Sequence, residues 1–289
     1  MTHKPVLMQE LIQFLALKPN QNLIDATIGL AGHAKKILPL ISSKGKILGI
    51  DQDEAVIDFL KKERIKRLYL KQGNFKNLSE IAESVGFNRI NGIYFDLGLG
   101  SWQIEKTQYG LSFQKDMPLL MKIQNPKSKI QNDITASDIV NKYSKKELAE
   151  ILGKYGEVYK PYQIANKIIQ FRDKKPISST LELAESTGIK NPKNLAKVFQ
   201  ALRIYVNNEF ENLQIALTKS VDILEKGGRI VVISYHSGED RIVKNIFRQF
   251  SKEGRLKIVT KKPVMSGYKE IERNKRARSA KMRVAEKII

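Results

Sequence analysis

The sequence contains no cysteine and only three histidines among its 289 residues. A chain without cysteine has no disulfide, no thiolate metal ligand and no cysteine nucleophile, and it suits a reducing compartment. Three histidines are also a poor basis for a zinc site. We therefore expect no metal centre in this protein.

Long apolar stretches are missing as well. No run approaches the roughly 18 apolar residues of a membrane-spanning helix. The first residues, MTHKPVLMQEL, lack the apolar centre of a secretory signal peptide. The sequence therefore predicts a cytoplasmic protein that does not cross a membrane, and it leaves open whether that protein is a monomer or a homodimer.

Acidic residues are scarce beside basic ones. The 30 Asp and Glu face 51 Lys and Arg, so the formal net charge is +21. Such a surplus favours a polyanionic partner, above all nucleic acid, with a solvated lysine-rich surface as the alternative interpretation. The bases concentrate near the end of the chain, in TKKP at 260–263 and RNKRARSAKMR at 273–283. A basic cluster inside foldable sequence favours the nucleic-acid interpretation.

The first hundred residues alternate short apolar runs with helical patterns, as βαβ units do. We expect strands at about 22–25, 46–50, 67–71 and 91–96, with helices at about 32–41, 53–63 and 76–85. The following block carries helical patterns, notably at 144–156, 162–175 and 191–206. After it we expect a helix over 207–228 with a Gly-Gly cap, a buried strand in RIVVISYHS, and strands near 255–260 and 281–286.

These patterns predict an α/β core in two parts. The parts are residues 1–103 and 207–289, and the helical insertion at 104–206 is the candidate substrate-recognition domain. In a parallel sheet, ligands bind at the carboxyl ends of the strands. The strand ends at Asp25, Asp51, Gly73 and Asp96 are therefore the places to look for a site.

The segment NLIDATIGLAGHAKKIL at 22–38 passes from a strand through a loop with two glycines into a helix. A triphosphate loop ends in Gly-Lys-Ser/Thr, whereas this loop has Gly32-His33-Ala34. The glycines at 29 and 32 do not complete the G-x-G-x-x-G of a dinucleotide site. Asp51, roughly 20 residues further on, suits both hydroxyls of a ribose, with helix capping as its alternative role. A ribose without a pyrophosphate indicates S-adenosylmethionine.

Three more strand ends supply candidate side chains. Phe75 suits the face of an adenine, with core packing as the alternative. Asp96 ends a central strand, where its carboxylate suits an exocyclic base amine or the amino-acid end of the cofactor. Ser234, His236 and Ser237 are expected at the same edge. Asp96 and His236 are the candidate catalytic residues.

Taken together, these segments resemble the ribosomal RNA small-subunit methyltransferase H family. The motifs are HKPVLMQEL, DATIGLAGH, GIDQD, GNF, DLGLGSWQ, YGLSF, FQALRIYVNNE, GGRIVVISYHSGEDRIVK, TKKP and NKRARSAKMRVAE, and they cover nearly the whole chain. The resemblance implies a class I S-adenosylmethionine-dependent methyltransferase, with a Rossmann-like, mostly parallel sheet and an inserted helical domain. It further implies N4-methylation of a decoding-centre cytidine in the 16S rRNA of the small ribosomal subunit.

The resemblance also assigns roles to residues. Ala31, Gly32 and His33 would form the cofactor loop, Asp51 would hold the ribose, and Phe75, Asp96 and Gln103 would complete the S-adenosylmethionine site. For this function we expect Lys261, Lys262, Arg276 and Arg278 to contact the RNA backbone, and Trp102 and Tyr109 to stack on bases.

The sequence departs from the family pattern mainly on the substrate side. The loop is thinned to GLAGH, and Leu99-Gly100-Ser101-Trp102 replaces Val-Ser-Ser-Pro. In MPLLMKI at 117–123, Leu120 replaces an acid and Lys122 an arginine. These changes support an alternative, a catalytically weakened RNA-binding ribosome-assembly factor with the same fold. A third possibility is an amine methyltransferase that acts on DNA or protein.

Overall fold

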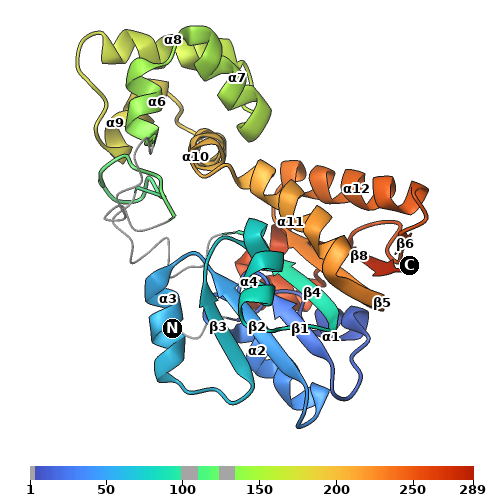
Figure 1. Ribbon diagram of the computed structural model, residues 1–289. Helices are drawn as coiled ribbons and strands as arrows, with labels where there is room; N and C mark the ends of the chain where they lie inside the picture. The colour runs from blue at the N-terminus through green and yellow to red at the C-terminus, as the bar shows by residue number, and fades with distance from the viewer. Residues whose placement is uncertain (1–3, 99–109, 124–133) are drawn as a thin grey trace. The chain divides into compact units, whose positions relative to one another are not determined.

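The structure is a computed structural model that describes residues 4–98, 110–123 and 134–289 (Figure 1). The chain divides into two compact units, one of Met1–Gly98 with Phe210–Ile289 and one of Leu99–Glu209. The first is an α/β unit and the second is helical. The chain thus leaves the α/β unit once and returns to it. None of the helices in the described ranges has both the length and the apolar character needed to cross a bilayer.

The described part of the α/β unit contains one eight-stranded sheet in the order β3-β2-β1-β4-β5-β8-β6, with β7 paired to β8. The strands are β1 (Asn22–Asp25), β2 (Lys46–Asp51), β3 (Leu68–Gln72), β4 (Ile90–Asp96), β5 (Leu224–Ser234), β6 (Leu256–Ile258), β7 (Val264–Met265) and β8 (Lys281–Lys287). The first five are parallel, and β8 is antiparallel to its neighbours. The predicted mostly parallel sheet is therefore confirmed.

The direction of each strand decides which loops meet. Because β8 runs antiparallel to both β5 and β6, the latter two run the same way. The end of β6 and the start of β8 therefore lie at the same edge of the sheet as the carboxyl ends of β1, β2, β4 and β5. This edge, the carboxyl edge below, collects the residues after β6 and those before β8, including both basic motifs.

Helices cover both faces of the sheet (Figure 1). They are α1 (Met8–Leu15), α2 (Gly32–Ile37), α3 (Glu54–Lys62), α4 (Leu78–Ser84), α11 (Glu209–Ile223), α12 (Ser237–Lys252) and α13 (Tyr268–Arg273), with 3-10 turns η1 (Leu38–Ile41), η2 (Phe75–Asn77) and η3 (Lys275–Ser279). Buried residues of α4, α11 and α12 share one apolar core with the strands. On the other face, the Leu15 side chain of α1 lies close over Gly92 of β4.

Two predicted helix ends are wrong. The predicted helix at 32–41 changes at Leu38 into the 3-10 turn η1, which contains Pro39; proline has no N–H for a helical hydrogen bond. The predicted Gly-Gly cap does not exist, because α11 ends at Ile223 and β5 already begins at Leu224. Leu224 is buried and pairs with Ile90, and Gly228 lies where an added Cβ would be 2.9 Å from a carbonyl oxygen of β4. The glycines thus serve an irregular strand start.

The described part of the helical unit contains α6 (Ala136–Lys142), α7 (Lys145–Gly156), α8 (Pro161–Arg172), α9 (Thr180–Thr187) and α10 (Pro192–Val206). The helices predicted at 144–156, 162–175 and 191–206 are confirmed as α7, α8 and α10, with small shifts at their ends. These helices bury a separate apolar core of their own. That core includes Leu119 and Met121, so the 117–123 segment packs as part of this unit.

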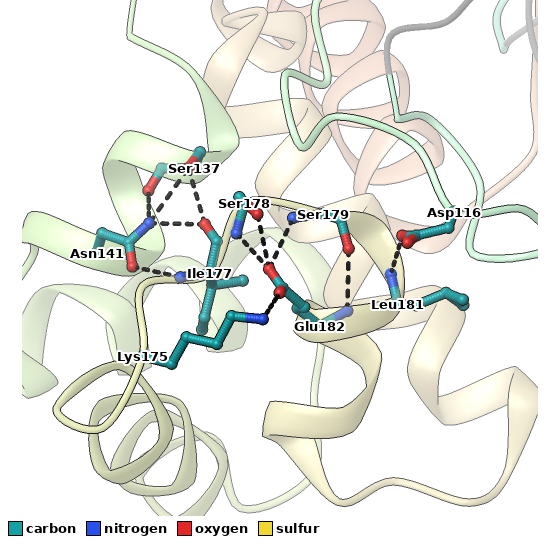
Figure 2. Close-up of polar contacts among 9 residues, drawn as sticks. All are labelled: Asp116, Ser137, Asn141, Lys175, Ile177, Ser178, Ser179, Leu181 and Glu182. Carbon is teal, nitrogen blue, oxygen red and sulfur yellow. Dashed lines mark hydrogen bonds and ion pairs between the residues drawn. The ribbon is translucent and has the colours of Figure 1, made fainter.

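Polar contacts fix the start of α9 (Figure 2). Glu182 accepts hydrogen bonds from the backbone of Ser178 and Ser179 and forms an ion pair with Lys175. The side chain of Asn141 pairs with both the N–H and the C=O of Ile177. These contacts hold the turn before α9 against α6.

Candidate active site

Three aspartates end neighbouring strands at the carboxyl edge. Asp25 ends β1, Asp51 ends β2 and Asp96 ends β4. They lie close enough that the charges of Asp96 and Asp51 both raise the pKa of Asp25. A cluster of acids at the centre of a parallel sheet is typical of a ligand site.

Asp51 holds the loop after β1. One carboxylate oxygen accepts a hydrogen bond from Gly29 N–H at 3.0 Å, and the other accepts from Asp53 N–H at 3.0 Å. Burial raises the pKa of Asp51 to about 6, although these backbone donors act in the opposite direction. The capping role belongs to Asp53, which accepts a hydrogen bond from Ala55 N–H and begins α3. Asp51 is therefore not the helix cap.

Asp25 is the most buried of the three acids, with 2% of its surface exposed. Burial raises its pKa to about 8, although a hydrogen bond from Thr27 N–H favours the ionised form. The neighbouring Tyr94 is also buried, and burial together with Asp25 raises the pKa of its hydroxyl. In the sequence, Asp25 is recognisable only as the end of a strand. Its burial depends on the residues that pack around it, and these are not adjacent in the sequence.

Asp96 is held from several sides. Its backbone N–H donates to Thr27 Oγ1 at 2.7 Å, and its Oδ1 accepts a hydrogen bond from Tyr235 Oη at 2.6 Å. Its Oδ2 lies 3.8 Å from His33 Nδ1. Thr27 and Tyr235 were missed in the sequence, since neither stands in a pattern that points to this contact.

The loop at residues 29–33 is fixed by backbone geometry. Ala31 is buried in a left-handed conformation at φ 59°, and Gly32 begins α2. His33 is buried, and its Nε2 lies 3.0 Å from the carbonyl oxygen of Val6. Because Nε2 faces an acceptor, it carries the ring proton in the neutral form, and Nδ1 faces Asp96. The loop therefore connects the N-terminal segment to the central acid.

Phe75 lies at the carboxyl edge after β3. Its ring meets Phe95 edge to face at a centroid distance of 5.9 Å, and it is partly buried against the core. Both expected roles are compatible with this position, since one face of a partly buried ring packs while another stays accessible.

His236 lies at the N-terminus of α12 and acts as its cap. Its Nδ1 accepts from Glu239 N–H at 3.4 Å, and its Nε2 lies 3.0 Å from Glu239 Oε1. Ser234 is buried, with its hydroxyl bonded to the carbonyl of Lys281, and Ser237 is the first residue of the helix. Both His236 nitrogens thus face Glu239.

The residues expected to meet RNA fall into two groups. Trp102 and Tyr109 lie outside the described residues, as does Gln103, which was expected in the S-adenosylmethionine site. Lys261 and Lys262 follow β6, and Arg278 lies in η3 before β8; all three are exposed at the carboxyl edge. Arg276 also lies in η3 but is less exposed, with its guanidinium 5.6 Å from the centre of the Tyr235 ring.

The described residues fit S-adenosylmethionine. A carboxylate has about four acceptor positions, and backbone donors use one on each oxygen of Asp51, so capacity remains for ribose hydroxyls. The loop glycine at 29 has φ +47°, a backbone conformation suited to close approach. Phe75 supplies an aromatic surface at the next strand end. We expect these residues to hold the adenosine.

Comparisons with known proteins agree along the whole chain. The model of the MraW methylase family matches residues 1–288. The ribosomal RNA small subunit methyltransferase H of Caldicellulosiruptor saccharolyticus is 43% identical over 99% of both chains, and that of Carboxydothermus hydrogenoformans is 41% identical over 99% of this chain and 98% of the relative. A solved rRNA methylase from Streptococcus thermophilus covers 100% of this chain and 99% of its own, at 13% identity and a TM-score of 0.46.

The family match and the two sequence relatives decide the assignment, because they span nearly every residue at high identity. The chain therefore belongs to the MraW methylase family, which confirms the predicted class of enzyme, an S-adenosylmethionine-dependent methyltransferase.

Proposed function

We propose that this enzyme methylates the N4 amino group of a decoding-centre cytidine in the 16S rRNA of the small ribosomal subunit. The single observation that carries the proposal is the match over 99% of the chain to relatives named ribosomal RNA small subunit methyltransferase H. The geometry of the carboxyl edge supports it, since a held acid lies beside the residues that fit the methyl donor.

Methyl transfer to a cytosine amine requires mainly that the amine is positioned against the methyl group and that an acceptor lies beside the amine. The lone pair of an exocyclic cytosine amine is shared with the ring, so the nitrogen must be freed and must lose a proton during transfer. S-adenosylmethionine supplies the methyl group. Asp96, with one oxygen held by Tyr235, is suited to accept the proton that the amine loses as its nitrogen bonds the methyl carbon and S-adenosylhomocysteine leaves. In-line positioning of the amine against the methyl group lowers the barrier further.

Substrate binding is supported by charge. Lys261, Lys262 and Arg278 are exposed at the same edge of the sheet as Asp96. Positive side chains in this place suit the phosphates of an RNA whose target base is turned out toward the acid. These three bases would thus bind the RNA beside the acid that takes part in the reaction.

The RNA-binding assembly factor remains the second candidate, because Leu120 and Lys122 replace an acid and an arginine of the family pattern. Lys122 is buried, and the neighbouring carbonyl of Met121 accepts a hydrogen bond from the Asn207 side chain. The segment is thus packed into the helical unit.

One experiment separates these candidates. Unmodified small subunits, naked 16S rRNA, DNA and bulk protein are each incubated with the enzyme and methyl-labelled S-adenosylmethionine, and labelled rRNA is digested to nucleosides. We expect N4-methylcytidine as the labelled nucleoside. Subunit binding without label would support the assembly factor, and label in DNA or protein would indicate the third possibility.

A pair of matched variants tests the role of Asp96. Asp96→Asn keeps the shape but removes the charge, and loss of a proton acceptor typically costs about 10²- to 10⁴-fold in rate. Asp53→Asn is the control, since asparagine caps a helix as well as aspartate does. Equal methyl-transfer rates for Asp96→Asn and Asp53→Asn would show that Asp96 has no part in the reaction.

A further inference from the structure

We propose that Tyr235 is a positioning residue that fixes the carboxylate of Asp96 for methyl transfer. The proposal rests on the proposed function in one respect, namely that Asp96 meets the target amine or the methyl donor. Tyr235 follows β5, and Asp96 ends the neighbouring β4, so the pair forms only because the two strands are adjacent.

The contact between the two side chains is short and directional. Tyr235 Oη lies 2.6 Å from Asp96 Oδ1. Burial and the charge of Asp96 raise the pKa of Tyr235 far above its usual value, so the phenol stays protonated. The tyrosine is therefore always the donor and the carboxylate the acceptor, which is the stronger, charge-assisted kind of hydrogen bond.

The surroundings hold the tyrosine ring in place. An added Cβ at Gly98 would lie 3.0 Å from the Tyr235 ring, and Gly98 has φ +122°, so a larger residue there would displace the ring. The Arg276 guanidinium also lies 5.6 Å from the ring centre, within range of a cation–π interaction. Arg276 is itself placed by Asn274, whose side chain accepts from Arg276 N–H.

Among the described residues, the Asp96 carboxylate therefore has a hydrogen bond on one oxygen, and the other oxygen is placed to meet a ligand. Tyr235 occupies Oδ1, whereas Oδ2 lies 3.8 Å from His33 Nδ1, beyond hydrogen-bond distance. The backbone of Asp96 is anchored separately by Thr27. Without the phenol the carboxylate would be free to rotate about χ2, a torsion that is broad in aspartate. Tyr235 thus removes a rotation that would misplace Oδ2.

A double-mutant cycle tests this role. Tyr235→Phe and Asp96→Ala are made singly and together, and two quantities are measured: the single-turnover rate of transfer to small subunits, and the dissociation constant of S-adenosylhomocysteine. A hydrogen bond to a charged group corresponds to about 10- to 100-fold. We expect Tyr235→Phe to lower the rate or the affinity by that factor when Asp96 is present, and to change neither in the Asp96→Ala background.

The control is Tyr69→Phe, which removes a phenol from the partly exposed Tyr69 on β3. It should leave both quantities unchanged. Equal losses from Tyr235→Phe in both backgrounds would mean that the residue is merely structural, and no loss in either background would also overturn the proposal. If the wild-type enzyme fails to methylate subunits, the proposed function fails, and the cycle on S-adenosylhomocysteine affinity alone decides the role of Tyr235.

Discussion

The burial of Asp25 lowers the stability of the folded protein by an amount that depends on pH. Burial raises its pKa from 3.8 to about 8, so the folded protein holds a proton that the unfolded chain loses above its ordinary pKa. The free energy of unfolding is therefore greatest near pH 3.8, the ordinary pKa of the group, and falls as the pH rises toward the folded-state pKa of about 8. Asp51, with its pKa raised to about 6, acts in the same direction over a shorter range. A buried acid of this kind suits a functional site better than a structural one.

This cost predicts the behaviour of Asp25→Asn. The amide keeps an oxygen for Thr27 N–H but does not ionise. We measure the free energy of unfolding without cofactor between pH 5 and pH 8. In this range the wild-type value should fall more steeply with pH than the value of the variant, by up to about 1.4 kcal/mol per pH unit. Urea unfolding at several pH values measures this. Parallel stability curves would show that Asp25 ionises normally.

At the scale of the element, loops and helix ends explain most of the site. The cap of α12, the start of α2 and the turn after β2 each bring side chains to the carboxyl edge. Such ends leave backbone groups without helical partners, so the residues beside them serve either as caps or as ligand contacts. His236 and Asp53 cap their helices, whereas Asp51 does not.

His236 should therefore tolerate replacement by another capping residue. His236→Asn keeps an acceptor for the helix, so we expect nearly wild-type stability and transfer rate. His236→Ala removes the cap and should lower the free energy of unfolding by about 1 kcal/mol. Thermal unfolding and transfer assays measure both. A large rate loss in the asparagine variant would instead give His236 a catalytic role.

A substitution at Gly49 of β2 would test how closely the loop after β1 packs on the sheet. An added Cβ would lie 2.8 Å from Ile28 Cγ1 and 3.1 Å from Ile28 Cβ, which belongs to that loop. Gly49→Ala should destabilise the protein by about 1–3 kcal/mol and weaken cofactor binding, because overpacking moves the backbone. Chemical unfolding and calorimetric titration measure these effects.

A second glycine supplies the control for that substitution. Gly153 lies within α7, where an added Cβ would be 3.6 Å from its nearest neighbour, an ordinary contact with Pro161. Gly153→Ala should be neutral or stabilise by up to about 1 kcal/mol, since alanine favours a helix. A destabilised Gly153→Ala and an unaffected Gly49→Ala would contradict the packing argument.

For the molecule as a whole, the sheet order brings both basic motifs and the three acids to one edge. The sheet order places the residues after β6 and before β8 beside the acids, although they are far from them in the sequence. A polyanion drawn to these bases arrives at the reactive edge. Association should therefore weaken steeply with salt, as binding to phosphates does.

Charge reversal at the two edges of the sheet measures this effect. Lys261→Glu with Lys262→Glu should weaken rRNA binding and lower the salt slope by about one for each phosphate that is no longer bound. Lys18→Glu with Lys44→Glu is the control of equal charge, because both lysines are exposed and precede β1 and β2 at the opposite edge. Filter binding across salt concentrations compares them. Equal salt slopes for the two double variants would mean that rRNA binding depends only on the net charge of the protein and not on where the lysines lie.

The order of most strands and helices, the acids at the strand ends and the basic surplus could be predicted from the sequence, because periodicity and composition are local properties of a chain. The burial of Asp25, the strand start at Leu224 and the contact of Tyr235 with Asp96 become visible only in the folded structure. Each depends on residues that are distant in sequence and meet only when the strands pair, so no local pattern records them.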